Sequence, residues 1–127
     1  MAFNGNFLCT SFKVELMKAV HNFTAASNVF KLALYDNSAT FTAATTAYTA
    51  TNEISGTNYT AGGNFLTSVT PTSSSTTAFT DFADEVFSTV TISAVRGALI
   101  YNDAASGDPT VCVLDFGADK AASSGDF

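Results

Sequence analysis

The feature that most constrains this fold is the alternation of side chains in the last third of the sequence. From Val86 to Ile92, one set of side chains (Val86, Ser88, Val90, Ile92) alternates with a second set (Phe87, Thr89, Thr91). This is the period of two that places the sets on opposite faces of a β-strand. Val95 to Tyr101 and Thr110 to Phe116 are also expected to be strands, and the turn-forming residues 102–109 separate them. These last two segments are therefore expected to pair as a hairpin.

Earlier segments add further elements. Phe12, Leu16, Ala19, Val20 and Phe23 recur at helical spacing and predict a helix. Strands are expected at 29–35, 64–69 and 78–83, with a polar tip at 71–77, and Gly62 and Gly63 are expected to be flexible. At 127 residues there is room for one domain. The predicted class is mainly β with one N-terminal helix (α+β), as an antiparallel β-sandwich or barrel-like domain. The predicted division is an arm (1–9), a helix (10–23), a β core (29–116) containing a long ordered loop (39–63), and a small polar tail (117–127).

The composition narrows the class of function. Only 13% of residues are charged, while threonine and serine make up about a quarter of the chain. Hydroxyl surfaces are inexpensive to desolvate, which favours assembly with other proteins, although a threonine-rich β-protein explains the same composition. A net charge of −6 argues against nucleic-acid binding. No signal peptide or membrane span is apparent, so synthesis in the cytoplasm and no membrane partner are expected.

No set of residues predicts catalysis or a cofactor. His21 is the single histidine, and no nucleophile motif accompanies it, so a surface or helix-packing role is expected. Asp81, Asp84 and Glu85 are expected to lie in a solvated, charged turn before the Val86 strand. The alternative, that their carboxylates act as the acid and base of a hydrolase, is disfavoured. Asp115 lies in an Asp-Phe-Gly string without the other kinase motifs, and is expected to be exposed at a strand end. The prediction is a protein that is not an enzyme and has no metal site.

Cys9 and Cys112 stand far apart, without CxxC spacing or a nearby histidine. Two thiols are expected. A disulfide, within one subunit or between two, is the alternative.

Several strings together resemble a family of small virion proteins of tailed bacteriophages. The likeness spans most of the chain and rests on Phe7–Lys13, His21–Phe23, Phe30–Tyr35, Thr45–Thr49, Glu53–Gly63, Arg96–Asn102 and Val113–Gly117. The resemblance implies a structural role in the virion without catalytic residues. Family members continue with a further apolar strand where this sequence has Gly125-Asp126-Phe127, so a neighbour is expected to complete the sheet edge, or the strand is missing.

The function expected from these points is a capsid decoration, or cement, protein that binds the outer lattice of the major capsid protein. A homo-oligomer is expected. A neck or tail ring component, and a receptor- or glycan-binding fibre module, are the alternatives. The long loop and the arm are the expected contact surfaces, with the aromatic residues Tyr48, Tyr59, Phe3 and Phe7 making the contacts.

Overall fold

The computed structural model describes residues 3–127 and is mainly β, with 46% of residues in strands and one short helix. The expected α+β class is confirmed. In chain order the elements are β1 (Phe7–Leu8), α1 (Thr10–Met17), β2 (Phe30–Tyr35), β3 (Asn64–Leu66), β4 (Ser68–Ser74), β5 (Thr77–Phe82), β6 (Val90–Asn102) and β7 (Thr110–Gly125).

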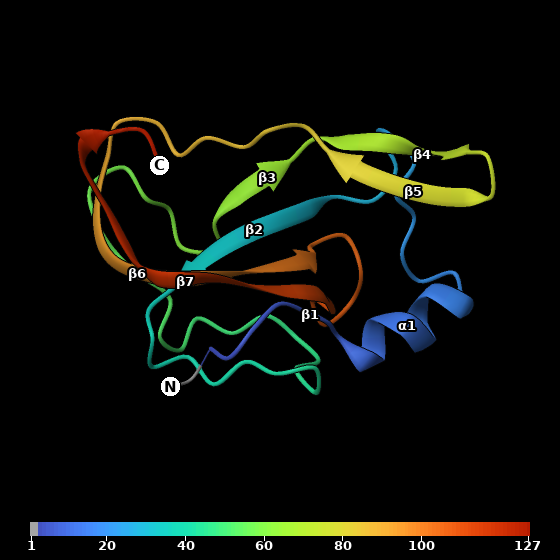
Figure 1. Cartoon of the computed structure of the whole chain (residues 1–127), viewed down its shortest axis with the longest axis horizontal. Coiled ribbons are helices and arrows are strands. Elements are labelled where there is room, and N and C mark those ends of the chain that lie inside the picture. Colours follow the sequence, from blue (N-terminus) through green and yellow to red (C-terminus); the bar gives the residue numbers. More distant parts are fainter. Residues whose placement is uncertain (1–2) are drawn as a thin grey trace.

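The strands form one five-stranded antiparallel sheet, in the order β1-β7-β6-β2-β3, and a separate β4–β5 hairpin (Figure 1). The expected hairpin of the last two strands is confirmed, since Leu99 pairs with Val113 and Ile100 with Cys112 across β6 and β7. The sheets do not close into a barrel, so the arrangement is sandwich-like.

Both faces of β2, an interior strand of the sheet, are largely buried, which explains its nearly continuous apolar sequence. Ala33 and Tyr35 pack into a large cluster that includes Phe41 and Leu99. Leu34, on the opposite face, packs into a smaller cluster with other buried apolar residues, namely Ile54, Phe87, Val90, Ile92, Val95 and Ala98. Chain segments outside the sheet therefore have to cover it on both sides.

The helix is shorter than predicted, because it ends at Met17 instead of continuing to Phe23. Ala19 has a left-handed φ of 57°, its N–H donates to Leu16 O, and Val20 N–H donates to Glu15 O. These two bonds form a Schellman motif, which turns the chain away from the helix axis. His21 and Phe23 are still buried, but an irregular segment positions them.

The long loop at 39–63 is ordered, as predicted, and it contributes side chains to the core on both faces of the sheet. Ala39 and Phe41 are buried in it, and the Tyr48 ring stacks on Tyr101 of β6 at 4.6 Å between centroids. Its end is not flexible: Gly63 is buried at φ +76°, and a Cβ there would lie 1.8 Å from Leu32 O. Its burial against the chain's own sheet accounts for its length without a neighbouring subunit.

Three other expectations are wrong. The predicted strand at Val86 begins at Val90 and continues without a break to Asn102. The predicted polar tail instead forms most of β7, and Phe127 exchanges two backbone hydrogen bonds with Phe87. Ladder hydrogen bonds use backbone groups, so short side chains at an exposed edge do not prevent a strand. The polar tip at 71–77 is mostly strand, with only residues 75–76 in the turn between β4 and β5.

Candidate functional site

His21 is buried and packs against α1, which is the second of the two roles expected for it. Its side chain has no exposed area, and its ring stacks on Phe23 and Phe30. Asn102 Nδ2 lies 3.2 Å from Nδ1 and can only donate, so Nδ1 accepts and Nε2–H donates to Glu15 Oε2 at 2.9 Å. Both ring nitrogens are thus engaged in packing the segment after α1 against the sheet, and neither faces a surface where a substrate could bind.

The acidic cluster is dispersed. Asp81 lies in β5 and accepts a hydrogen bond from its neighbour's N–H, Asp84 is exposed, and Glu85 accepts a 2.7 Å hydrogen bond from Asn64 Nδ2. Among residues 3–127, no group of three or more His, Cys, Asp or Glu side chains is placed to hold a metal ion.

Asp115 is not exposed at a strand end, as the sequence had suggested. It lies within β7 with 10% of its side chain exposed, and its Oδ1 is 2.9 Å from Nε of the buried Arg96. The Arg96 hydrogen bond and a second one from the Gly117 N–H lower the pKa of Asp115. Arg96 and Asp115 lie on adjacent strands, so this ion pair ties β6 to β7 where the register shifts.

Tyr48 and Tyr59 were predicted as exposed contact residues, but both hydroxyls point inward to the same carboxylate. Tyr48 Oη donates to Glu53 Oε2 and Tyr59 Oη to Glu53 Oε1, each at 2.7 Å, and the Gly62 N–H adds a third bond of 2.7 Å. Burial and the hydrogen bond to Glu53 raise the pKa of both tyrosines. This cluster fixes the long loop to the sheet, and it leaves neither hydroxyl free for a partner.

The aromatic residues of the predicted N-terminal arm (1–9) are also packed inward, and residues 1–2 lie outside the described part of the chain. Phe3 is fully buried, lies edge-on to Phe41, and fits under Gly97, where a Cβ would lie 2.5 Å from the Phe3 ring. Phe7 is half-buried in β1 and pairs with Val113. The aromatic side chains of the arm therefore stabilise this chain's own core.

Cys9 and Cys112 are free thiols. Cys112 pairs with Leu8, and successive residues of an extended chain point to opposite faces, so the Cys9 side chain points away from the face that Cys112 occupies. Burial raises the pKa of Cys112 to about 12. Both thiols are protonated and poorly nucleophilic at neutral pH.

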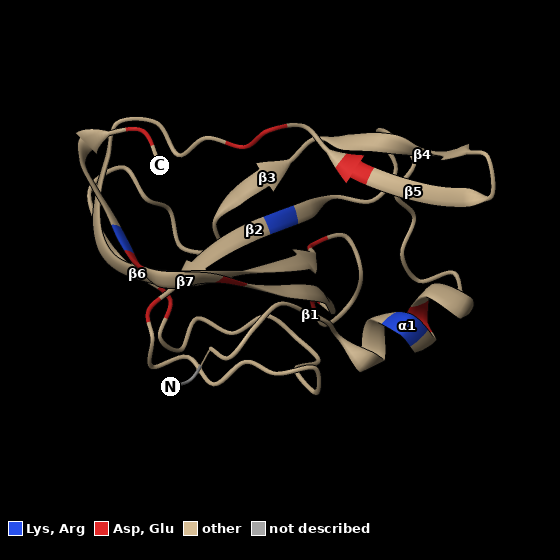
Figure 2. Ribbon diagram, viewed as in Figure 1, with Lys and Arg blue, Asp and Glu red and all other residues tan. Residues whose placement is uncertain are grey.

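The most distinctive surface feature is an apolar groove between α1 and the β4–β5 hairpin, which flank one end of the sheet (Figure 1). It encloses about 560 Å³, and no charged side chain lines it. Leu8 and Phe79, at its rim, are 54% and 49% exposed. Other lining residues are Phe12, Leu16, Phe23 and Phe82. Figure 2 shows basic and acidic residues side by side on α1, and an acidic residue at the end of β5. No local sequence pattern marks this groove, because its residues come from six different helices and strands.

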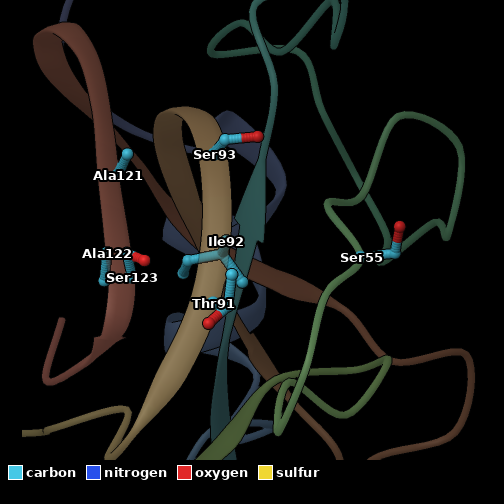
Figure 3. A pocket seen from close by; sticks show the side chains of 7 residues that line it. All are labelled: Ser55, Thr91, Ile92, Ser93, Ala121, Ala122 and Ser123. Carbon is cyan, nitrogen blue, oxygen red and sulfur yellow. The ribbon is translucent and has the colours of Figure 1, made fainter.

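A second hollow lies beside the outer parts of β6 and β7 (Figure 3). It is lined by short side chains, and the hydroxyls of Ser55, Thr91 and Ser93 point in different directions. Without converging polar groups it has no arrangement for binding a small molecule.

Comparison with protein-family models, with curated proteins and with solved structures finds no match to this chain. Among the described residues, no helix is long and apolar enough to cross a membrane.

Proposed function

We propose that this chain is a non-enzymatic structural protein of a tailed-bacteriophage virion, and specifically a capsid decoration protein that binds the outer capsid lattice and stabilises the head. The observation that carries the proposal is the amount of apolar surface outside a filled core. Ten large apolar side chains of residues 3–127 are at least one-third exposed, although two core clusters are already packed. Grouped exposed apolar residues are typical of surfaces that other proteins cover.

The surface proposed to contact the major capsid protein is the patch formed by Val29 and Phe65. These residues, 41% and 63% exposed, line one hollow of about 430 Å³ at the β3 edge of the sheet. Lys31 Nζ lies 4.7 Å from the centre of the Phe65 ring and holds the ring in place by a cation–π contact. A rigid exposed aromatic side chain is the kind of residue that dominates binding energy at protein interfaces.

The stabilising mechanism follows from repetition. A patch of this size supports only a modest affinity for one subunit. On a lattice the same contact recurs at every equivalent position, and a domain that touches two neighbouring subunits gains from the high effective concentration of the second contact. The hydroxyl-rich, sparsely charged surface reduces the cost of desolvation at each contact.

The proposal is tested by binding purified protein to phage particles that lack it, followed by sedimentation and quantification of the bound copies. Phe65→Ser is expected to lower occupancy at least about tenfold, because it removes an exposed aromatic contact without disturbing the core. Val86→Ser, at a residue 48% exposed but outside the hollow, is the matched control and is expected to bind normally.

Copy number separates decoration from the alternative neck or tail position. Many copies spread over the shell support decoration, and a small fixed number at one vertex supports a neck or tail ring. No binding to particles by the unmodified protein would refute a virion role.

A further inference from the structure

The turn between β6 and β7 contains the one Asp-Pro peptide bond of the sequence, Asp108–Pro109, and the backbone on its N-terminal side is strained. Asp108 has a left-handed φ of 47°. A proline ring crowds the residue that precedes it and favours an extended backbone there, so a left-handed residue is unfavourable at this position. Backbone strain of this kind persists only where the surrounding structure holds it.

Hydrogen bonds hold the backbone on both sides of this bond. The Asp108 N–H donates to Ala105 O at 3.2 Å, and the Tyr48 N–H donates to Asp108 O at 3.0 Å. On the other side of the bond Pro109 is buried, and its carbonyl oxygen accepts a 2.9 Å hydrogen bond from the Asn102 N–H. The chain therefore cannot leave the strained conformation while these contacts are intact.

We propose that Asp108–Pro109 is a self-cleavage site, at which the folded chain cuts its own backbone in weak acid. A carboxylate oxygen of Asp108 attacks the carbonyl carbon of the same residue and closes a cyclic anhydride. The Pro109 nitrogen leaves with the electron pair of the broken C–N bond, takes a proton from the solvent and becomes a secondary amine. Water then hydrolyses the anhydride, which gives Asp108 a free side-chain carboxyl group and a free α-carboxyl group.

The fold favours this step in two ways. The Tyr48 N–H is hydrogen-bonded to the carbonyl oxygen of Asp108, on which negative charge develops as the carboxylate attacks. Breaking the C–N bond also removes the crowding between Asp108 and the proline ring, so the strain is released as the reaction proceeds. Solvent can supply the proton and the water, since Asp108 is only half-buried and Gly107 before it is exposed.

The cut separates residues 1–108 from residues 109–127 and leaves the sheet assembled. β7 pairs with β6 between Thr110 and Gly125, and the Thr110 N–H donates to Thr46 O at 3.1 Å. The two fragments are therefore expected to stay associated until the protein is denatured. This inference does not depend on the proposed virion role, and it can be tested on the isolated protein.

The test incubates the full chain at the lowest pH at which circular dichroism still shows the native fold. Mass spectrometry after denaturation is expected to find fragments 1–108 and 109–127, whose masses together exceed that of the intact chain by one water. The folded chain is expected to cleave at least about tenfold faster than the same chain in urea at the same pH, because only the folded chain holds the strain. Asp108→Asn removes the carboxylate nucleophile and is expected to abolish both fragments.

Thr70→Asp provides a matched control, because it places a second Asp-Pro bond in the same chain. Thr70 precedes Pro71 in β4, is exposed and has no positive φ. In the folded variant, cleavage at 108–109 is expected to be at least about tenfold faster than cleavage at 70–71, whereas in urea the two bonds are expected to cleave at similar rates.

Three results would overturn the inference: equal rates at the two bonds in the folded variant, a folded chain that cleaves no faster than the unfolded chain, or fragments that persist in Asp108→Asn. None of them affects the particle-binding test of the Val29–Phe65 patch.

Discussion

At the scale of single residues, Glu53 fixes the long loop more directly than any other side chain described. Glu53→Gln keeps the size of the side chain but replaces one acceptor oxygen with a donor, next to donors from Tyr48, Tyr59 and Gly62. We expect a loss of about 1 to 2 kcal/mol in the free energy of unfolding, measured by urea denaturation. Asp84→Asn, at an exposed carboxylate, is the control and is expected to change stability by less than about 0.5 kcal/mol. Equal stability of the two variants would contradict the role assigned to Glu53.

Arg96 and Asp115 make a residue-scale prediction that depends on pH. The hydrogen bond from Arg96 lowers the pKa of Asp115 from its ordinary value of 3.8, so this carboxylate stabilises the fold above that pH and loses its contribution as the pH falls through the folded-state value. The difference in urea midpoint between the unmodified chain and Asp115→Asn is therefore expected to be constant from pH 7 to about 5 and to shrink below about 4. A difference that grows in acid would show that the sign is wrong.

At the scale of elements, the C-terminal end of α1 has an unfavourable backbone conformation at a residue that is not glycine. Ala19 occupies the left-handed position of the Schellman motif, where glycine is the usual residue. Ala19→Gly relieves the steric cost and is expected to raise the free energy of unfolding by about 0.5 to 1 kcal/mol. Ala44→Gly, at an exposed loop residue without positive φ, is expected to lower it slightly through the entropy of the unfolded chain. A destabilising Ala19→Gly would contradict this description of the helix end.

The same residue shows why part of the fold was predictable and part was not. The apolar residues of β2, β6 and the first half of β7 are mostly buried or half-buried, so the fold class and the last hairpin could be predicted from the sequence. Phe12 and Phe23 are both buried, but the helical spacing between them is coincidental, since Ala19 has a left-handed φ and ends the helix. An alanine gives no sequence signal for such a turn, so the predicted helix was too long. The outer half of β7 was missed because its strand depends on backbone pairing with β6 and not on apolar side chains.

The inward orientation of the tyrosines was equally invisible in the sequence. An aromatic residue in a polar loop has the same local signature whether it contacts a partner or its own core. Tyr48 and Tyr59 point inward because both hydroxyls donate hydrogen bonds to Glu53, and the position of Glu53 cannot be predicted from the sequence. The groove was unpredictable for a related reason, since it is created by the positions of α1 and the hairpin relative to each other.

At the scale of the whole molecule, the chain is a filled β core with two separate apolar surfaces. One, at Val29 and Phe65, is proposed to bind the capsid; the other lies between α1 and the hairpin. Several residues of types that can act in catalysis have structural contacts instead. His21 is buried, and Glu53 and Asp115 bind neighbouring side chains. Both cysteines are free thiols whose pKa is raised by burial. These internal contacts support the proposal that the chain acts by binding other proteins.

The proposed virion role is tested most directly by a cryo-EM reconstruction of the phage particle whose genome encodes this chain. The account predicts density for the β domain at repeated positions on the outer face of the capsid lattice, with Phe65 against the major capsid protein. Purified particles with no density for this domain on the capsid would contradict it.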